Sequence, residues 1–184
     1  MSPNQLARAV VLAFAFFLLS ATGTALAQKQ YGPGVTDTEI KIGQTYPYSG
    51  PLSAYSTMAR VEAAVFAKLN AEGGLNARKI NLISLDDGYS PPRTVEQTRR
   101  LVEQEQVFLL FNSLGTPTSM AVIKYVNQRH VPHLFLATGA SVFGDYRAYP
   151  WTMGFQPNYP AEARAFARYI MKNLPQARVG VLFP

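Results

Sequence analysis

The chain has 184 residues, a formal net charge of +6 and no cysteine, and 48% of its residues are hydrophobic. The lack of cysteine excludes disulfide scaffolds, thiolate metal sites and cysteine nucleophiles, and the hydrophobic fraction is too high for a disordered chain. The basic residues are scattered, with Arg99-Arg100 as the densest pair. A nucleic-acid surface needs a basic cluster or stripe, so we expect no nucleic-acid partner.

Residues 1–27 are predicted to be a secretory signal peptide. Arg8 precedes an unbroken apolar run over residues 9–19, and Ala25-Leu26-Ala27 has the small-x-small pattern that signal peptidase cleaves. The apolar run is shorter than the about 20 residues of a membrane-spanning helix, so an uncleaved anchor is the weaker alternative. We predict cleavage after Ala27 and export to the periplasm. Without cysteine, no lipid can be attached to an N-terminal cysteine.

The rest of the sequence alternates between strand and helix patterns. Residues 54–72 carry Met58, Val61, Val65 and Leu69 at helical spacing, which predicts a single buried apolar face. The continuous apolar run at residues 107–111 is typical of a strand buried on both sides. In chain order, we predict strand 39–46, helix 54–72, strand 79–85, helix 91–106, strand 107–111, helix 116–129, strand 131–136, strand 149–155, helix 160–173 and strand 178–183.

This alternation predicts an α/β fold with a parallel sheet flanked by helices. Ligands of such sheets bind beyond the carboxyl ends of the strands. The loops predicted at those ends are 46–55, 86–91, 112–117 and 137–145. Asp86 and Asp87 in the second loop could be metal ligands, but without a third ligand at motif spacing we favour hydrogen bonding within the turn.

The last predicted strand, 178–183, has nothing after it in the sequence to pair with it or cover it. A buried strand left in this way would expose apolar side chains and open backbone edges. We therefore expect that the sequence is part of a longer chain.

Several motifs lie in those loops and in the turns between elements. They are Ser49-Gly50-Pro51 with Tyr55, the turn Asn70-Ala71-Glu72-Gly73-Gly74-Leu75, Asp86-Asp87, Gly115-Thr116, and the segment 132–141 (PHLFLATGAS). In this order and spacing they resemble the periplasmic solute-binding proteins of the leucine/isoleucine/valine-binding type. The resemblance covers residues 36–184.

The resemblance implies a type I periplasmic binding protein fold of two lobes, truncated in this sequence. Residues 1–27 would be the signal peptide, 28–148 a partial first lobe, 149–157 the first crossing between lobes, and 158–184 the start of the second lobe. The implied function is that of the substrate-binding component of an ABC importer. It would capture a branched-chain amino acid or a related small carboxylate between the lobes and deliver it to the membrane permease. We expect a monomer without cofactor or metal.

The resemblance also implies ligand-binding residues: Tyr55, Gly115, Thr116, Ala137, Thr138 and Gly139. A helix beginning at Thr116 would present free amides and a positive dipole end to a carboxylate. Alternatively, Thr116 only caps that helix and Gly139 only serves a turn. Gly115 offers a backbone amide where amino-acid binders of the family often have serine. An aliphatic or aromatic acid therefore stays open beside an amino acid.

Two other functions stay open. The first is the ligand-binding ectodomain of a membrane receptor, which would carry a transmembrane helix after residue 184. The second is a secreted hydrolase, with Ser141 as the nucleophile to test. The sequence has neither the G-x-S-x-G nor the H-E-x-x-H motif, and Ser141 has no evident histidine partner. We therefore expect no enzymatic activity and assign no catalytic residue.

Overall fold

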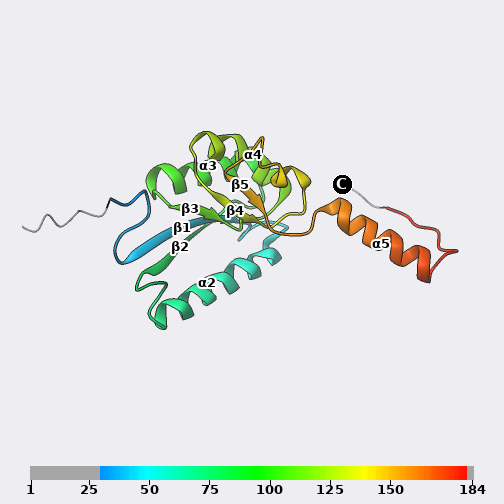
Figure 1. Ribbon diagram of the computed structural model, residues 1–184, viewed down its shortest axis with the longest axis horizontal. Helices are drawn as coiled ribbons and strands as arrows, with labels where there is room; N and C mark the ends of the chain where they lie inside the picture. The colour runs from blue at the N-terminus through cyan, green and yellow to red at the C-terminus, as the bar shows by residue number, and fades with distance from the viewer. Residues whose placement is uncertain (1–29, 182–184) are drawn as a thin grey trace, which may run out of the picture. The chain divides into compact units, whose positions relative to one another are not determined.

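The computed structural model describes residues 30–181, and the predicted signal peptide lies outside these residues. Five parallel strands form one sheet in the order β2-β1-β3-β4-β5 (Figure 1). The strands are β1 (Glu39–Tyr46), β2 (Lys79–Asp86), β3 (Leu109–Phe111), β4 (His133–Leu136) and β5 (Thr152–Gly154). Because every pair is parallel, all five carboxyl ends lie at one edge of the sheet.

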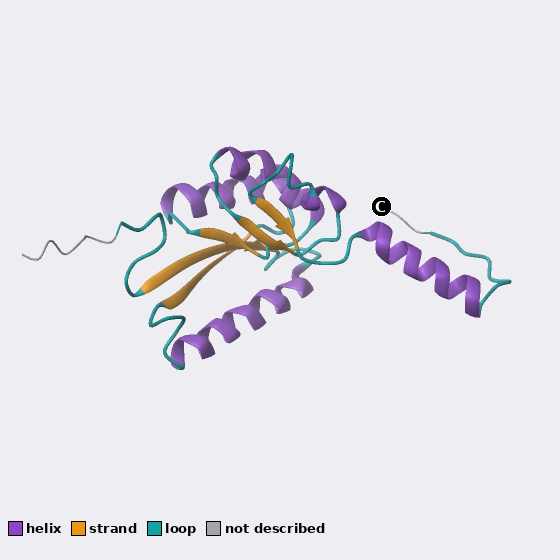
Figure 2. Cartoon of the chain, in the orientation of Figure 1, coloured by secondary structure: helices purple, strands orange, loops and turns teal. Residues whose placement is uncertain are grey.

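Helices flank both faces of this sheet, so the expected α/β class is confirmed. Helix α2 lies on one face, and α3 and α4 lie on the other (Figure 2). The helices are α2 (Ser56–Ala71), α3 (Pro91–Arg99), α4 (Thr116–Gln128) and α5 (Tyr159–Asn173), with short 3-10 turns η1 (Ser53–Tyr55) and η3 (Ser141–Gly144) and a π-helical turn η2 (Arg100–Gln104) after α3. Within residues 30–181, none of these helices is long and apolar enough to cross a membrane.

The main core lies between the sheet and the helices α3 and α4. Its buried side chains are Leu101, Val107, Leu110, Val122 and Val126. On strand β1, a Cβ at position 43 would lie only 3.0 Å from a methyl carbon of Leu101, so glycine at this position allows the leucine to pack directly on the strand.

The predicted apolar face of α2 is wrong at two of its four residues, whereas Met58 and Leu69 are half-buried. Val61 and Val65 are each 57% exposed, whereas Ala59 is fully buried. Glu62 faces the sheet and accepts hydrogen bonds from Gln44 Nε2 at 2.7 Å and from Asn112 Nδ2 at 2.6 Å. These two strand-side amides need a partner on the helix, so the helix turns a carboxylate rather than its valines toward them. Burial raises the pKa of Glu62 to about 7, despite the hydrogen bonds from Asn112 and Gln44.

A row of aromatic rings continues this face of the sheet from α2 across the strands. Phe66 on α2 contacts Phe111 edge to face, with ring centroids 5.6 Å apart. Phe135 lies 5.9 Å from Phe111 on one side and 5.9 Å from Phe155 on the other. Such edge-to-face contacts stabilise the packing beyond the apolar area that they bury.

The strand predicted at residues 178–183 is also wrong for the residues that the structure describes. Residues 178–181 have no strand assignment and are exposed. None of the five strands of the sheet pairs with this segment. An apolar β-branched segment becomes a strand only when a neighbouring strand supplies hydrogen-bond partners, and here the tertiary structure supplies none.

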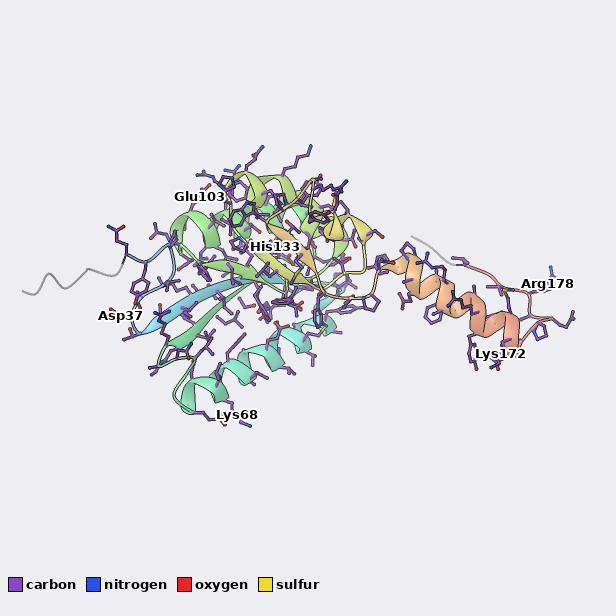
Figure 3. All side chains as sticks on the ribbon, in the orientation of Figure 1. Asp37, Lys68, Glu103, His133, Lys172 and Arg178 are labelled. Carbon is purple, nitrogen blue, oxygen red and sulfur yellow. The ribbon has the colours of Figure 1, made fainter. Side chains whose placement is uncertain are left out.

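His133 on β4 is completely enclosed, and neither ring nitrogen has a hydrogen-bond partner among the described residues (Figure 3). Burial disfavours the charged imidazolium and lowers the pKa of His133 to about 3. The folded pKa is thus below the unfolded value of about 6.5. The contribution of neutral His133 to stability is therefore fully present above pH 6.5 and is lost as the pH falls from 6.5 toward 3.

We predict that His133→Leu makes the free energy of unfolding less dependent on pH between 6.5 and 4. In the unchanged chain, this one group contributes a slope that approaches about 1.4 kcal/mol per pH unit. Urea denaturation at several pH values measures the slope. His130→Asn is the control, because His130 is exposed. Equal slopes in the His133 variant and the unchanged chain would contradict the prediction.

Candidate ligand-binding site

A cavity of about 240 Å³ lies at the carboxyl edge of the sheet. The segments that follow β1, β2, β3, β4 and β5 all contribute to its lining. The lining residues are Leu52, Tyr55, Met58, Tyr89, Leu114, Gly115, Thr116, Ala137, Gln156 and Tyr159. This is the edge at which the parallel arrangement predicts ligand-binding loops.

The residues implied by the resemblance lie close together here. Tyr55, Gly115, Thr116 and Ala137 line the cavity itself. Thr138 is buried beside it, with its hydroxyl 2.6 Å from that of Thr116. Gly139, the last of the six, follows Thr138 in the sequence. Its carbonyl accepts a hydrogen bond at 2.8 Å from the backbone amide of Tyr159, which lines the cavity.

The start of α4 supplies hydrogen-bond donors to the cavity. Gly115 is the N-cap residue, and no side chain caps the helix. The hydroxyl of Thr116 bonds to Thr138, so it does not act as the helix cap that the alternative interpretation required. Within the described part of the chain, the amides of Thr116 and Thr118 have no acceptor. These free N–H groups and the helix dipole make the helix start favourable for an anion.

Gly115 is required by its conformation and by a neighbouring ring. Its φ of +101° lies in a region that residues with a side chain rarely adopt. A Cβ at this position would lie 2.8 Å from Thr118 Oγ1 and would overlap the ring of Tyr89. Tyr89 is itself held in place, because its amide donates to Asp87 Oδ1 at 2.9 Å. The phenol ring of Tyr89 thus lies directly against the glycine backbone at the cavity wall.

Gly139 makes a matching contact with Tyr159, the first residue of α5. A Cβ at position 139 would lie 2.6 Å from Cδ1 of the Tyr159 ring. The Tyr159 hydroxyl lies 3.3 Å from Thr138 Oγ1. Hydrogen bonds from Thr138 and Thr116 lower the pKa of the Tyr159 phenol below its usual value. Gly139 therefore allows the start of α5 to dock on the loop after β4.

Tyr159 is one of the cavity-lining residues that the sequence does not predict, together with Leu52, Met58, Tyr89, Leu114 and Gln156. It lies one residue before the predicted start of helix 160–173, in a segment without a recognisable ligand motif. The available signal was Asn158, whose side chain caps α5 by accepting from the amide of Ala161 at 2.9 Å. This cap fixes the helix start at Tyr159. Its hydroxyl contact with the loop after β4 depends on tertiary packing, which the sequence pattern does not encode.

The two adjacent acids at the end of β2 serve as hydrogen-bond acceptors for the loops. Asp86 accepts from the amides of Tyr48, Ser49 and Gly88 and forms an ion pair with Arg93 at 3.0 Å. Desolvation alone would raise its pKa, but hydrogen bonds from the Ser49 hydroxyl, the amides of Gly88 and Ser49, and Arg93 prevail and lower it to about 2. Asp87 accepts from the amide of Tyr89 and, at 2.9 Å, from the Thr94 hydroxyl. This geometry fits the turn interpretation of the two acids.

Metal binding by these acids has no further support. Among residues 30–181, no three His, Cys, Asp or Glu side chains lie together in a way that could hold a metal ion.

Comparisons with known proteins agree with this fold. Residues 39–184 match the family model described as periplasmic binding protein. The Leu/Ile/Val-binding protein homolog 7 of Brucella abortus is 29% identical over 138 residues, covering 71% of this chain and 34% of that protein. A possible leucine/isoleucine/valine-binding protein from Rhodopirellula baltica is 28% identical, with a TM-score of 0.68 over 74% of this chain and 37% of that structure.

A third comparison shows the same fold at lower identity. A branched-chain amino acid transporter substrate-binding protein from Streptococcus pneumoniae, solved in complex with isoleucine, has a TM-score of 0.67 at 21% identity, over 75% of this chain and 39% of that one. The chain spans about a third of the length of the curated relative from Brucella abortus. The family model covers most of the sequence, from the first strand onward. The chain therefore belongs to the periplasmic binding protein family.

Proposed function

We propose that the chain forms part of the ligand cleft of a substrate-binding protein that serves an ABC importer in the periplasm. The protein captures a small carboxylate, either an amino acid or a related acid, and delivers it to the membrane permease without converting it. One observation carries this proposal: the start of α4, with Gly115 and Thr116, lines a cavity at the carboxyl edge of the sheet, and the free amides of α4 and the Thr116–Thr138 hydroxyl pair lie at or beside it.

Those donors suit the acid group of the ligand, because a carboxylate sheltered from water needs several hydrogen bonds to replace its hydration. The rest of the lining suits the ligand body. Leu52, Met58 and Leu114 provide apolar surface, and Tyr55 and Tyr89 provide ring faces with polar tips. A cavity of this composition fits a small acid with an apolar substituent.

The cavity lining also bears on whether the ligand carries an ammonium group. Among the described residues, no carboxylate side chain lines the cavity. An α-ammonium group on the ligand would therefore take its charged partner from another part of the protein. Aliphatic and aromatic acids without an ammonium group need no such partner, so they belong beside branched-chain amino acids among the proposed ligands.

The proposed mechanism uses the two-lobe organisation. Residues 28–148 would form the first lobe, 149–157 the first crossing, and 158–184 the beginning of the second lobe. Ligand held at the edge of the first lobe would be enclosed by hinge closure, and the permease would bind the closed form. The signal peptide over residues 1–27 would bring the protein to the periplasm as a monomer.

We predict that at least one of three carboxylates, L-leucine, octanoate or benzoate, binds at the start of α4. Its negative charge should shift the amide resonances of Thr116 and Thr118 in ¹H–¹⁵N NMR spectra recorded during a titration to millimolar concentration. Leucinamide, octanamide and benzamide are the matched controls, because they keep the body of each ligand and lack the carboxylate. If none of the acids shifts these amides, the proposed function is wrong.

We also predict that Thr116→Val weakens binding of that carboxylate about tenfold or more, because it removes one hydroxyl from the hydrogen-bonded group beside the carboxylate, and a hydrogen bond to a charged group contributes about 1.5–3 kcal/mol. Valine matches the shape of threonine but removes the hydroxyl. Thr116→Ser, which keeps the hydroxyl, should retain most of the affinity. The same NMR titration measures both dissociation constants. Unchanged affinity in the valine variant would exclude Thr116 from the site.

A further inference from the structure

We propose that Tyr159 is a ligand-binding residue: its phenol hydroxyl, together with those of Thr116 and Thr138, forms a hydroxyl chain that donates to the carboxylate. This inference rests on the proposed function and deepens it. It adds a donor from α5, the helix that would begin the second lobe, to a site otherwise built from the loops and helices around β1 to β4.

The position of Tyr159 is fixed by three contacts with a single loop. Its backbone amide donates to the carbonyl of Gly139 at 2.8 Å. Its ring packs against the same glycine, where a Cβ would lie 2.6 Å from Cδ1. Its hydroxyl is 3.3 Å from Thr138 Oγ1. With the amide, the ring and the hydroxyl all held, the phenol is preorganised beside the cavity, and binding costs little side-chain entropy.

The hydroxyl chain of Thr116, Thr138 and Tyr159 has one more proton than its internal hydrogen bonds use. The three hydroxyls carry three protons, and their two contacts, Thr116 with Thr138 and Thr138 with Tyr159, use two of them. The amide of Ala140 also donates to Thr138 Oγ1, at 3.2 Å. Because its oxygen already accepts from this amide, the Thr138 hydroxyl is favoured as the donor to one of its two hydroxyl neighbours. One hydroxyl proton is left to point out of the chain toward a ligand.

The phenol is the member best suited to carry this free proton. Hydrogen bonding with Thr138 and Thr116 lowers the pKa of Tyr159, against the opposing effects of burial and of the nearby charge of Glu162. When Thr116 donates to Thr138 and Thr138 donates to the phenol oxygen, the phenol keeps its own O–H for an outside acceptor. A phenol is also a stronger acid than an aliphatic alcohol, so it forms the stronger hydrogen bond to a carboxylate.

The phenol is accessible to a ligand. Tyr159 lines the same cavity as Thr116 and Gly115 and is 50% exposed. The same cavity is thus lined by Tyr159 from α5 and by Thr116 from the start of α4. A carboxylate seated there would receive donors from α4 on one side and from α5 on the other.

The test is Tyr159→Phe, which removes the hydroxyl and leaves the ring on Gly139. The chain and its variant are titrated with L-leucine, octanoate and benzoate, and the amide shifts of Thr116 and Thr118 are followed by NMR. For each acid that binds the unchanged chain, we expect the dissociation constant of the Tyr159→Phe variant to be at least tenfold larger. Tyr169→Phe, on the same helix and 63% exposed, is the matched control and should bind as the unchanged chain does.

A second variant separates recognition of the acid from a structural role of the ring. Gly139→Ala keeps the phenol but displaces its ring, so it should weaken carboxylate binding as well. Binding of the corresponding carboxamides should differ much less between Tyr159→Phe and the unchanged chain than binding of the acids does. A loss of similar size for acids and amides would overturn the proposed role.

The outcomes distinguish the two proposals. If no acid binds the unchanged chain, the proposed function fails and this inference fails with it. If an acid binds the unchanged chain and Tyr159→Phe binds it equally well, the proposed function stands and the role of Tyr159 is overturned.

Discussion

Parallel pairing of the five strands is the constraint on which the site depends. It brings the carboxyl ends of all strands to one edge, and β1, paired with β2 along its whole length from Glu39 to Tyr46, sets the position of that edge. Loops that meet there leave backbone amides without sheet partners. Asp86 and Asp87 satisfy those of the first two loops, whereas the amides at the start of α4 stay free. The difference between satisfied and unsatisfied amides distinguishes the supporting loops from the helix start that we propose as the ligand-binding element.

Periodicity and turn chemistry predict most of the fold. Strand 39–46 agrees with β1 residue for residue, and helix 116–129 ends one residue beyond α4. Both elements have clear local signals: alternating apolar residues in the strand, and a proline at the second position of the helix. The facing of α2 was not predictable in the same way. The spacing of apolar residues favours burial of Val61 and Val65. The helix is instead oriented by the side-chain amides of Gln44 and Asn112, which donate hydrogen bonds to Glu62.

The residues of the candidate site differ in the same way, because some have a local sequence signal and others depend on tertiary contacts. Gly115 and Thr116 follow a buried strand and open a helix, so local pattern and family resemblance both lead to them. Tyr159 has no such signal, because its place in the cavity depends on a hydroxyl contact with a loop some twenty residues earlier in the sequence. The Thr116–Thr138 bond is likewise tertiary, and for that reason the sequence left a helix cap open as an alternative. Contacts within one element were thus predictable, whereas contacts between loops were not.

The two tyrosine rings lie directly on glycine backbone, Tyr89 on Gly115 and Tyr159 on Gly139. Each glycine and its ring therefore form an epistatic pair: neither position can gain volume unless the other loses it. In a directed-evolution experiment on ligand preference, single substitutions at the two glycines would be eliminated, and improved variants would carry compensating changes at the tyrosines. Libraries that randomise residues 115 and 89, or 139 and 159, together would reach sequences that one-position scanning misses.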